Sequence, residues 1–273
     1  MRVAFGNWKY LFSNFWYVLV CGLIPAVFLA LSFDYTALSS VLHKFIQGQP
    51  RVHFVELLRA FGPIRIDSLL GGVYTLFTYI LSSIFASLLL SLVEKHMRIG
   101  KRTFSGMGVE MKNLLLPCFL IVLLFYALAE TAAIILSALM FWVFSIGSTA
   151  IVYLLCAIAV LLVGFVFLYV FESFYLWLPC LQISGFGPYH AFLYSYRLAL
   201  GVRWKLIGAH TLSILIAGAA LAGTAFLPEL VFRGVALVLC LLLYASLFIR
   251  METVYFETDK LDREDIIKSY KDL

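Results

Sequence analysis

Charged residues are scarce in this sequence: Asp, Glu, Lys and Arg make up 13% of the 273 residues, whereas 63% are hydrophobic. Ordinary soluble domains carry about 25% charged and roughly 45 to 50% apolar residues. A soluble chain of this length buries about three quarters of its surface, but here the apolar residues form long uninterrupted runs. The composition therefore excludes an ordinary soluble domain and indicates that lipid covers much of the chain.

Motifs of common enzymes and metal sites are also missing. The sequence contains no H-E-x-x-H, no G-x-S-x-G and no phosphate-binding glycine loop, and no two of its five cysteines form a C-x-x-C pair. Each cysteine lies in or beside an apolar run, where it is expected to pack as a small hydrophobic residue. We therefore predict no catalytic, cofactor-binding or metal-binding residue, no cofactor, and a protein that is not an enzyme.

Six apolar runs are long enough to cross a bilayer as helices, which takes about 20 residues each. Strands of a membrane barrel would alternate in polarity, and these runs do not. The first run lacks an A-x-A-like cleavage site after Arg2 and Lys9, so we expect it to be a retained span. The sequence predicts an all-α, six-span domain over residues 1–250, with spans at about 15–33, 68–93, 113–141, 149–177, 206–227 and 231–248, and a tail over residues 251–273.

The basic residues predict how these spans are oriented, because Lys and Arg are retained on the cytoplasmic side. With the N-terminus inside, fifteen of the twenty lie in cytoplasmic segments, and only Lys44, Arg51, Arg59, Arg65 and Arg233 lie outside. Both termini and the tail are therefore expected in the cytoplasm. The net charge of +5 follows from this bias; it favours anionic lipid headgroups as partners of the inner face and gives no evidence of nucleic-acid binding.

The connections between spans differ in length. Short turns at residues 145–149 and at Pro228-Glu229 join the third span to the fourth and the fifth to the sixth, as tight helical hairpins. The first outer loop is longer, and its apolar residues recur at helical spacing in Leu38, Val41, Leu42, Phe45 and Ile46 and again in Phe54, Leu57, Leu58 and Phe61. We predict two short amphipathic helices, which either lie on the membrane surface and cap the bundle or form a lid over a cavity.

A threefold internal repeat would make the domain three hairpins that all open toward the cytoplasm. A glycine followed by a lysine precedes each odd-numbered span, in residues 6–12, 108–114 and 201–207. Each even-numbered span ends in a glutamate, and these residues, Glu94, Glu172 and Glu252, are 78 and 80 positions apart. This spacing is typical of a repeat, but chance is an alternative because Trp, Tyr and Lys gather at membrane boundaries anyway.

The segment before the fifth span resembles an A-x-x-x-S-x-x-L-x-x-G-x-x-W stretch. The matching residues are Ala191, Ser195, Leu198, Gly201 and Trp204, and Leu178-Pro179 and Tyr255 fit the same pattern. In this respect the chain is similar to bacterial six-span families of the YciC-like and glycerophosphodiester-phosphodiesterase-associated membrane-domain type. The resemblance implies a bacterial inner-membrane protein with this architecture. It implies no activity, since catalysis in the fused members belongs to a soluble domain.

Two places in the predicted spans carry candidate polar sites. Glu130 lies about 17 residues into the third span, and Tyr126 and Ser137 fall on about the same helical face. A carboxyl group at this depth indicates either transport or proton-linked function, or a structural group hydrogen-bonded between helices. Glu172 and His210 lie near the inner ends of neighbouring spans, where they form a candidate pair across two helices.

Two functions fit these features. The absent catalytic motifs and the basic inner face favour a non-enzymatic scaffold or accessory subunit that binds another membrane protein. Glu130 and the possible lid instead favour a small transporter or lipid-handling protein. An enzyme would require several carboxylates at one depth in the bundle.

Overall fold

The computed structural model describes residues 2–48, 52–65, 68–144 and 149–263, and this part of the chain is helical without strands. Six helices are long and apolar enough to cross a membrane, which confirms a multi-pass helical protein. They are α2 (Phe15–Ser32), α5 (Leu69–Ile99), α6 (Met107–Val143), α7 (Thr149–Phe174), α9 (Pro188–Thr224) and α10 (Glu229–Thr258). The shorter helices are α1 (Arg2–Ser13), α3 (Tyr35–Ile46), α4 (Phe54–Phe61) and α8 (Trp177–Ile183).

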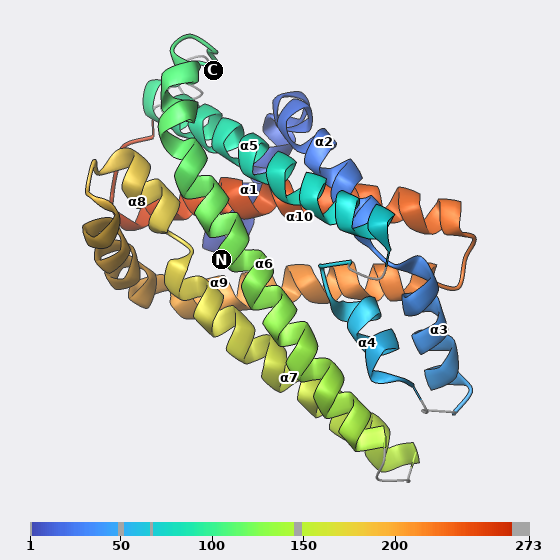
Figure 1. Ribbon diagram of the computed structural model, residues 1–273. Coiled ribbons are helices and arrows are strands. Elements are labelled where there is room, and N and C mark those ends of the chain that lie inside the picture. Colours follow the sequence, from blue (N-terminus) through green and yellow to red (C-terminus); the bar gives the residue numbers. More distant parts are fainter. Residues whose placement is uncertain (1, 49–51, 66–67, 145–148, 264–273) are drawn as a thin grey trace.

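The six long helices form a closed ring of contacts. Around this ring α2 packs on α5, α5 on α6, α6 on α7, α7 on α9, α9 on α10, and α10 on α2 again. A further contact between α5 and α10 crosses the ring. Figure 1 shows α6 and α7 side by side, and they extend away from α2 and α10.

Each end of the ring is closed by short helices. At what we call the α1–α8 end, α5 and α10 end beside α1 and α8, and the largest buried apolar cluster lies here, including Leu92, Leu178 and Ile249. At the opposite α3–α4 end, α2 ends and α10 begins beside α3 and α4. A smaller cluster around Ala30 and Phe232 joins α2, α9 and α10 at this end.

Local sequence sets several helix boundaries. Gly100 ends α5 and Gly106 precedes α6, both with a left-handed backbone (φ of 68° and 75°) that glycine adopts without a steric penalty. The Ser68 hydroxyl accepts a hydrogen bond from the Gly71 amide and so caps the start of α5. Pro188 occupies the first turn of α9, where its missing amide hydrogen costs nothing.

Several helices extend beyond the predicted spans. α9 begins at Pro188 instead of Leu206, and α10 continues to Thr258, so the predicted boundary after residue 250 falls inside α10. The residues after that boundary are buried, with Met251 and Glu252 each 0% exposed. The reason is packing: α10 contacts both α1 and α8 at this end, and these contacts favour helix over a solvated tail. Residues 264–273 of the predicted tail, and residues 145–148 of the predicted turn at 145–149, lie outside the described residues.

The two short helices predicted between the first and second spans are confirmed as α3 and α4. Val41 on α3 and Leu57 on α4 are buried, as the apolar spacing predicts, whereas Ile46 is exposed. α3 and α4 pack on each other, α4 packs on α6, and α3 touches α9. The pair therefore rests against the helices of the bundle.

Candidate functional site

The structure brings Glu172 and His210 together. Glu172 lies near the end of α7, His210 lies on α9, and a hydrogen bond joins His210 Nδ1 to Glu172 Oε1 in a fully buried position. The glutamate is 0% exposed and the histidine 6%. A buried carboxylate and imidazole in contact can share a proton or carry opposite charges, and either state lowers the cost of burying the carboxylate.

Aromatic rings enclose this pair. The Phe171 and Tyr175 rings each meet the His210 imidazole in a T-shaped arrangement, with ring centroids 5.6 Å and 4.8 Å away. The Tyr175 hydroxyl donates to the Leu247 carbonyl at 2.6 Å, so its hydrogen is already used within α10. The rings pack against the imidazole, and the Glu172 side chain bonded to it is fully buried.

The glutamates that end the three even-numbered spans all lie buried at the α1–α8 end. Glu94 on α5 pairs with Arg98 at 2.7 Å, and Glu172 pairs with His210. Glu252 on α10 lies within electrostatic reach of Glu94, and neither of its carboxylate oxygens has a hydrogen-bond partner in the described part of the chain. Three carboxylates thus lie at one end of the ring, although no three His, Cys, Asp or Glu side chains among the described residues are arranged to hold a metal ion.

Two arginines are buried at the same end. Arg203 on α9 lies over the rings of Tyr169 and Tyr196, at 4.8 Å and 5.0 Å, and donates to the Tyr169 hydroxyl at 3.0 Å. Arg250 on α10 is 1% exposed, and its Nε and Nη1 atoms have no acceptor on the described part of the chain. An arginine side chain keeps its charge in any protein environment, so Arg250 places a permanent positive charge inside the bundle.

Unpartnered polar atoms are concentrated at the α1–α8 end. Native proteins leave few buried polar atoms without a hydrogen bond, and those few call for an explanation. Most such atoms in the described chain belong to residues at this end, among them Asn7, Glu110, Glu172, Gln182, His210, Arg250 and Glu252. This end therefore offers donors and acceptors to a polar ligand or to a transferred proton.

The structure does not assemble Glu130, Tyr126 and Ser137 into one site. Within the described chain, no hydrogen bond joins these three side chains. Glu130 Oε2 instead accepts a hydrogen bond from the Ile64 amide at 3.3 Å, in the segment after α4. Tyr126 packs edge-on against Tyr79, and Ser137 is buried with its hydroxyl unpartnered. Because α6 begins at Met107, Glu130 falls in its second half, and its carboxylate supports the α3–α4 end.

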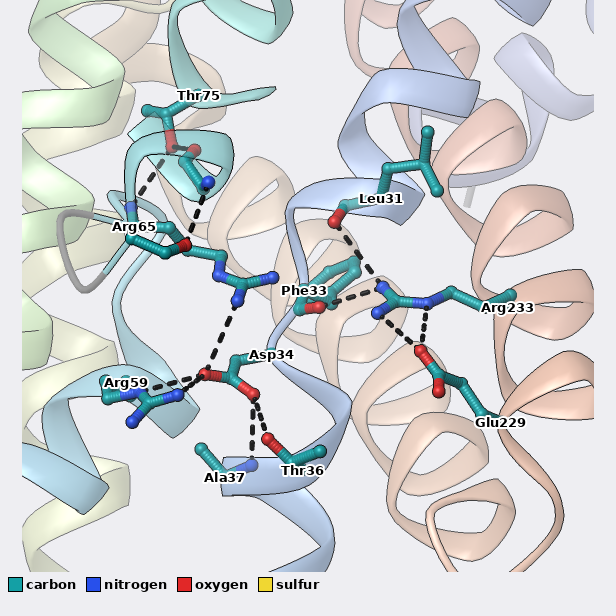
Figure 2. Close-up of polar contacts among 12 residues, drawn as sticks. Leu31, Phe33, Asp34, Thr36, Ala37, Arg59, Arg65, Thr75, Glu229 and Arg233 are labelled. Carbon is teal, nitrogen blue, oxygen red and sulfur yellow. Dashed lines mark hydrogen bonds and ion pairs between the residues drawn. The ribbon is translucent and has the colours of Figure 1, made fainter. Parts of the chain in front are cut away.

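Asp34 organises a second polar region at the α3–α4 end (Figure 2). Its side chain accepts hydrogen bonds from the Thr36 hydroxyl and the Ala37 amide, which caps α3. Arg59 on α4 donates to Asp34 from Nε at 2.9 Å, and the Arg65 guanidinium lies 3.8 Å away. Burial alone raises the pKa of Asp34, but these hydrogen bonds and the Arg59 charge together hold the pKa below its ordinary value.

Arg233 ties α10 to α2 beside this region. Its Nη1 atom donates to the Ala30 carbonyl at 2.9 Å. Figure 2 shows the same guanidinium bound to the Phe33 carbonyl, at 2.8 Å, and to Glu229 through its other nitrogens. The last carbonyls of a helix have no intrahelical partner and carry partial negative charge. The guanidinium therefore caps the end of α2 and fixes the position of the chain that enters α3.

An open pocket of about 380 Å³ lies between α3 and α4. Glu56 in its wall is bound by the Lys44 ammonium at 2.6 Å and the Ser40 hydroxyl at 2.5 Å. Burial raises the pKa of Glu56, but these hydrogen bonds and the Lys44 charge outweigh that effect and bring the pKa below its ordinary value. Glu130 does not line this pocket, whose residues are Thr36, Ala37, Ser40, His53, Val55, Glu56 and Arg59.

Comparisons with known proteins identify no relative of this chain. No family model, no curated protein and no solved structure matches it.

Sequence reasoning singled out Glu172 and His210 but missed Arg250, Arg203 and Asp34. All three residues lie next to predicted span boundaries, where charged residues are common and do not stand out in the sequence.

Proposed function

We propose that this chain is a multi-pass protein of a bacterial inner membrane, with both termini in the cytoplasm and three hairpins related by an internal repeat. Contacts within the pairs α2–α5, α6–α7 and α9–α10 support the hairpins. Glu94, Glu172 and Glu252 lie at the same end of the ring, as a threefold repeat requires. In this arrangement the α1–α8 end faces the cytoplasm, and its basic residues meet anionic lipid headgroups. The similarity at Ala191 to Trp204 supports membership of the YciC-like group.

Within that membrane, we infer that the protein is a small transporter or lipid-handling protein that uses the Glu172–His210 pair. The observation that carries this proposal is a buried carboxylate and imidazole in contact, each with one unpartnered atom, inside helices that span the bilayer. Ionisable groups in such segments are costly, and they commonly mark proton relays or substrate paths. The intramembrane carboxylate of this proposal is Glu172, in place of Glu130.

Proton exchange at this pair changes the charge between α7 and α9 at the α1–α8 end. Protonation of both groups makes the pair cationic, and loss of the shared proton makes it anionic. Tyr175 lies within electrostatic reach of both Glu172 and Arg250, so the charge change acts on α10 as well as on α7 and α9. Movement of these helices on proton transfer would open and close a path between them.

Reconstituted vesicles test this proposal. Purified protein is placed in liposomes loaded with a pH-sensitive dye, and small carboxylates, phosphates and amines are added outside under an imposed pH gradient; a parallel arm follows fluorescent phospholipid between leaflets. We expect solute-dependent proton flux or lipid movement that Glu172→Gln abolishes. The control Glu257→Gln removes an exposed carboxylate from the same end of α10 and should leave the rate unchanged. Equal rates in both variants would sink the proposal.

A scaffold or accessory subunit is the second candidate, and the exposure of α6 and α7 favours it. In the most apolar 18-residue stretch of each of these two spans, only 17% and 22% of the residues are buried within the chain. The exposed faces carry large side chains, including Leu116, Phe141, Trp142 and Leu161. They can pack against the spans of a partner as well as against lipid. Crosslinking in native membranes tests this candidate: recovery of the protein without any stoichiometric partner argues against it.

A further inference from the structure

Arg250 has no neutralising partner in the described chain. Its side chain is 1% exposed, and Nε and Nη1 have no acceptor. Because a guanidinium stays protonated, burial leaves a full charge that costs free energy unless an anion or hydrogen-bond acceptors reach it.

In the described chain, no hydrogen bond or ion pair joins any of the nearby acidic residues to Arg250. Glu172 lies within electrostatic reach of the same Tyr175 hydroxyl as Arg250, but its Oε1 atom binds His210. Glu252 follows Arg250 by two positions on α10, and at about 3.6 residues per turn the two side chains leave the helix in nearly opposite directions. Glu252 instead lies toward Glu94 and Cys118. The positive charge at Arg250 is thus left for a ligand.

We propose that Arg250 is the binding residue for a compact oxyanion, a carboxylate or phosphate group, held beside Tyr175 and the Glu172–His210 pair. Guanidinium groups bind both oxyanions through charge-assisted hydrogen bonds. The assignment rests on the proposed transport or lipid-handling function and gives its cargo a chemical class. The group comes from a free solute or from the headgroup of an anionic phospholipid.

α1 is the element that covers this site. It packs on α10 and α9, and its residue Asn7 is 0% exposed with both side-chain polar atoms unpartnered in the described chain. The Asn7 amide is a further donor on the helix that lies over α10. α1 ends at Ser13, and Asn14 alone separates it from α2.

Binding measured without transport tests the assignment. The full chain is purified in a neutral detergent, and its thermal unfolding is followed by tryptophan fluorescence with inorganic phosphate or acetate against chloride at constant ionic strength. A second arm uses nanodiscs of phosphatidylcholine with or without phosphatidylglycerol. At ~100-fold excess over Kd, we expect the unfolding midpoint to rise by about 5 °C in one of these arms.

Three variants locate the effect. Arg250→Gln should lose the anion-specific rise, Arg250→Lys should keep part of it, and the control Arg197→Gln, which removes an exposed arginine from the same end, should keep all of it. A rise in the free-anion arm identifies a solute, and a rise only with phosphatidylglycerol identifies a lipid headgroup. An equal rise in Arg250→Gln, or no rise for the native protein in either arm, overturns the assignment.

The outcome is separable from that of the flux experiment. Anion binding through Arg250 in a protein that carries no flux rejects the transport proposal alone. Flux that depends on Glu172, in a protein without anion binding at Arg250, rejects this assignment alone.

Discussion

Glu172 and His210 lie 38 positions apart in the sequence and share a buried hydrogen bond between α7 and α9. Neither group is stable alone in such surroundings, because each needs the other to offset the cost of leaving water. The pair therefore links two neighbouring helices of the ring and makes the stability of the α7–α9 contact depend on both residues.

A double-mutant cycle measures this dependence. Removal of one partner, by Glu172→Ala or His210→Ala, is expected to lower the free energy of unfolding by about 3 kcal/mol, since the remaining group stays buried without its partner. The double variant should lose less than the sum of the two, with a coupling of about 1 to 3 kcal/mol. Denaturant unfolding in detergent micelles supplies the four values. Additive losses would show that the pair contributes no mutual stabilisation.

Acid should weaken the α3–α4 end through Asp34. Its pKa is lower in the folded chain than in the unfolded chain, so its stabilisation is complete above the unfolded pKa of about 4. The contribution is lost as the pH falls through the lower folded pKa. Thermal unfolding between pH 7 and pH 3 should show a loss of stability at the acid end that Asp34→Asn reduces. The pKa of Glu56 is also lowered in the folded chain, so part of the acid-induced loss of stability should persist in Asp34→Asn. If the dependence of stability on pH is the same in Asp34→Asn as in the native protein, Asp34 does not have this role.

Glu130 gives a contrasting prediction. Because its carboxylate accepts one backbone hydrogen bond from Ile64, Glu130→Gln keeps an acceptor in place and should change the free energy of unfolding by less than about 1 kcal/mol. Transport rates should also stay near those of the native protein. If Glu130→Gln folds normally but loses all flux, Glu130 takes part in transport and this prediction is wrong.

A substitution at Gly62 tests the contact between Glu130 and the segment after α4. An alanine here would place its Cβ atom 2.7 Å from the Leu58 carbonyl oxygen and 3.2 Å from Glu130 Oε2. The backbone atom cannot move aside without disturbing the end of α4, so Gly62→Ala should cost about 1 to 3 kcal/mol. Gly108→Ala is the matched control, because its added Cβ meets no atom within 4 Å. Equal stability of the two variants would contradict a close approach at Gly62.

The sequence predicts the helices well because lipid imposes a simple rule on length and polarity. It also places Glu172 and His210 near the inner ends of neighbouring predicted spans, so their contact can be expected from the topology. Glu130 shows the limit of that reasoning: the predicted span begins at Asn113 and places Glu130 about 17 residues into the helix, whereas α6 begins six residues earlier, at Met107. The segment that covers Glu130 is set by the packing of α4 against α6. The apolar spacing within α4 predicts which side of α4 is buried, but it does not predict which helix packs against that side.

Cysteine labelling tests the orientation derived from the basic residues. Gln47→Cys at the end of α3 and Ser105→Cys between α5 and α6 each replace an exposed side chain, whereas the five native cysteines are all buried. In intact cells, a thiol reagent that cannot cross membranes should label Gln47→Cys and leave Ser105→Cys unlabelled until the membrane is opened. The reverse pattern would place the α1–α8 end, with Glu172 and Arg250, outside the cell. The positive-inside rule reflects retention of Lys and Arg on the cytoplasmic side during insertion. Moving basic residues from the segment around Ser105 to the segment around Gln47 should therefore weaken the preference for this orientation.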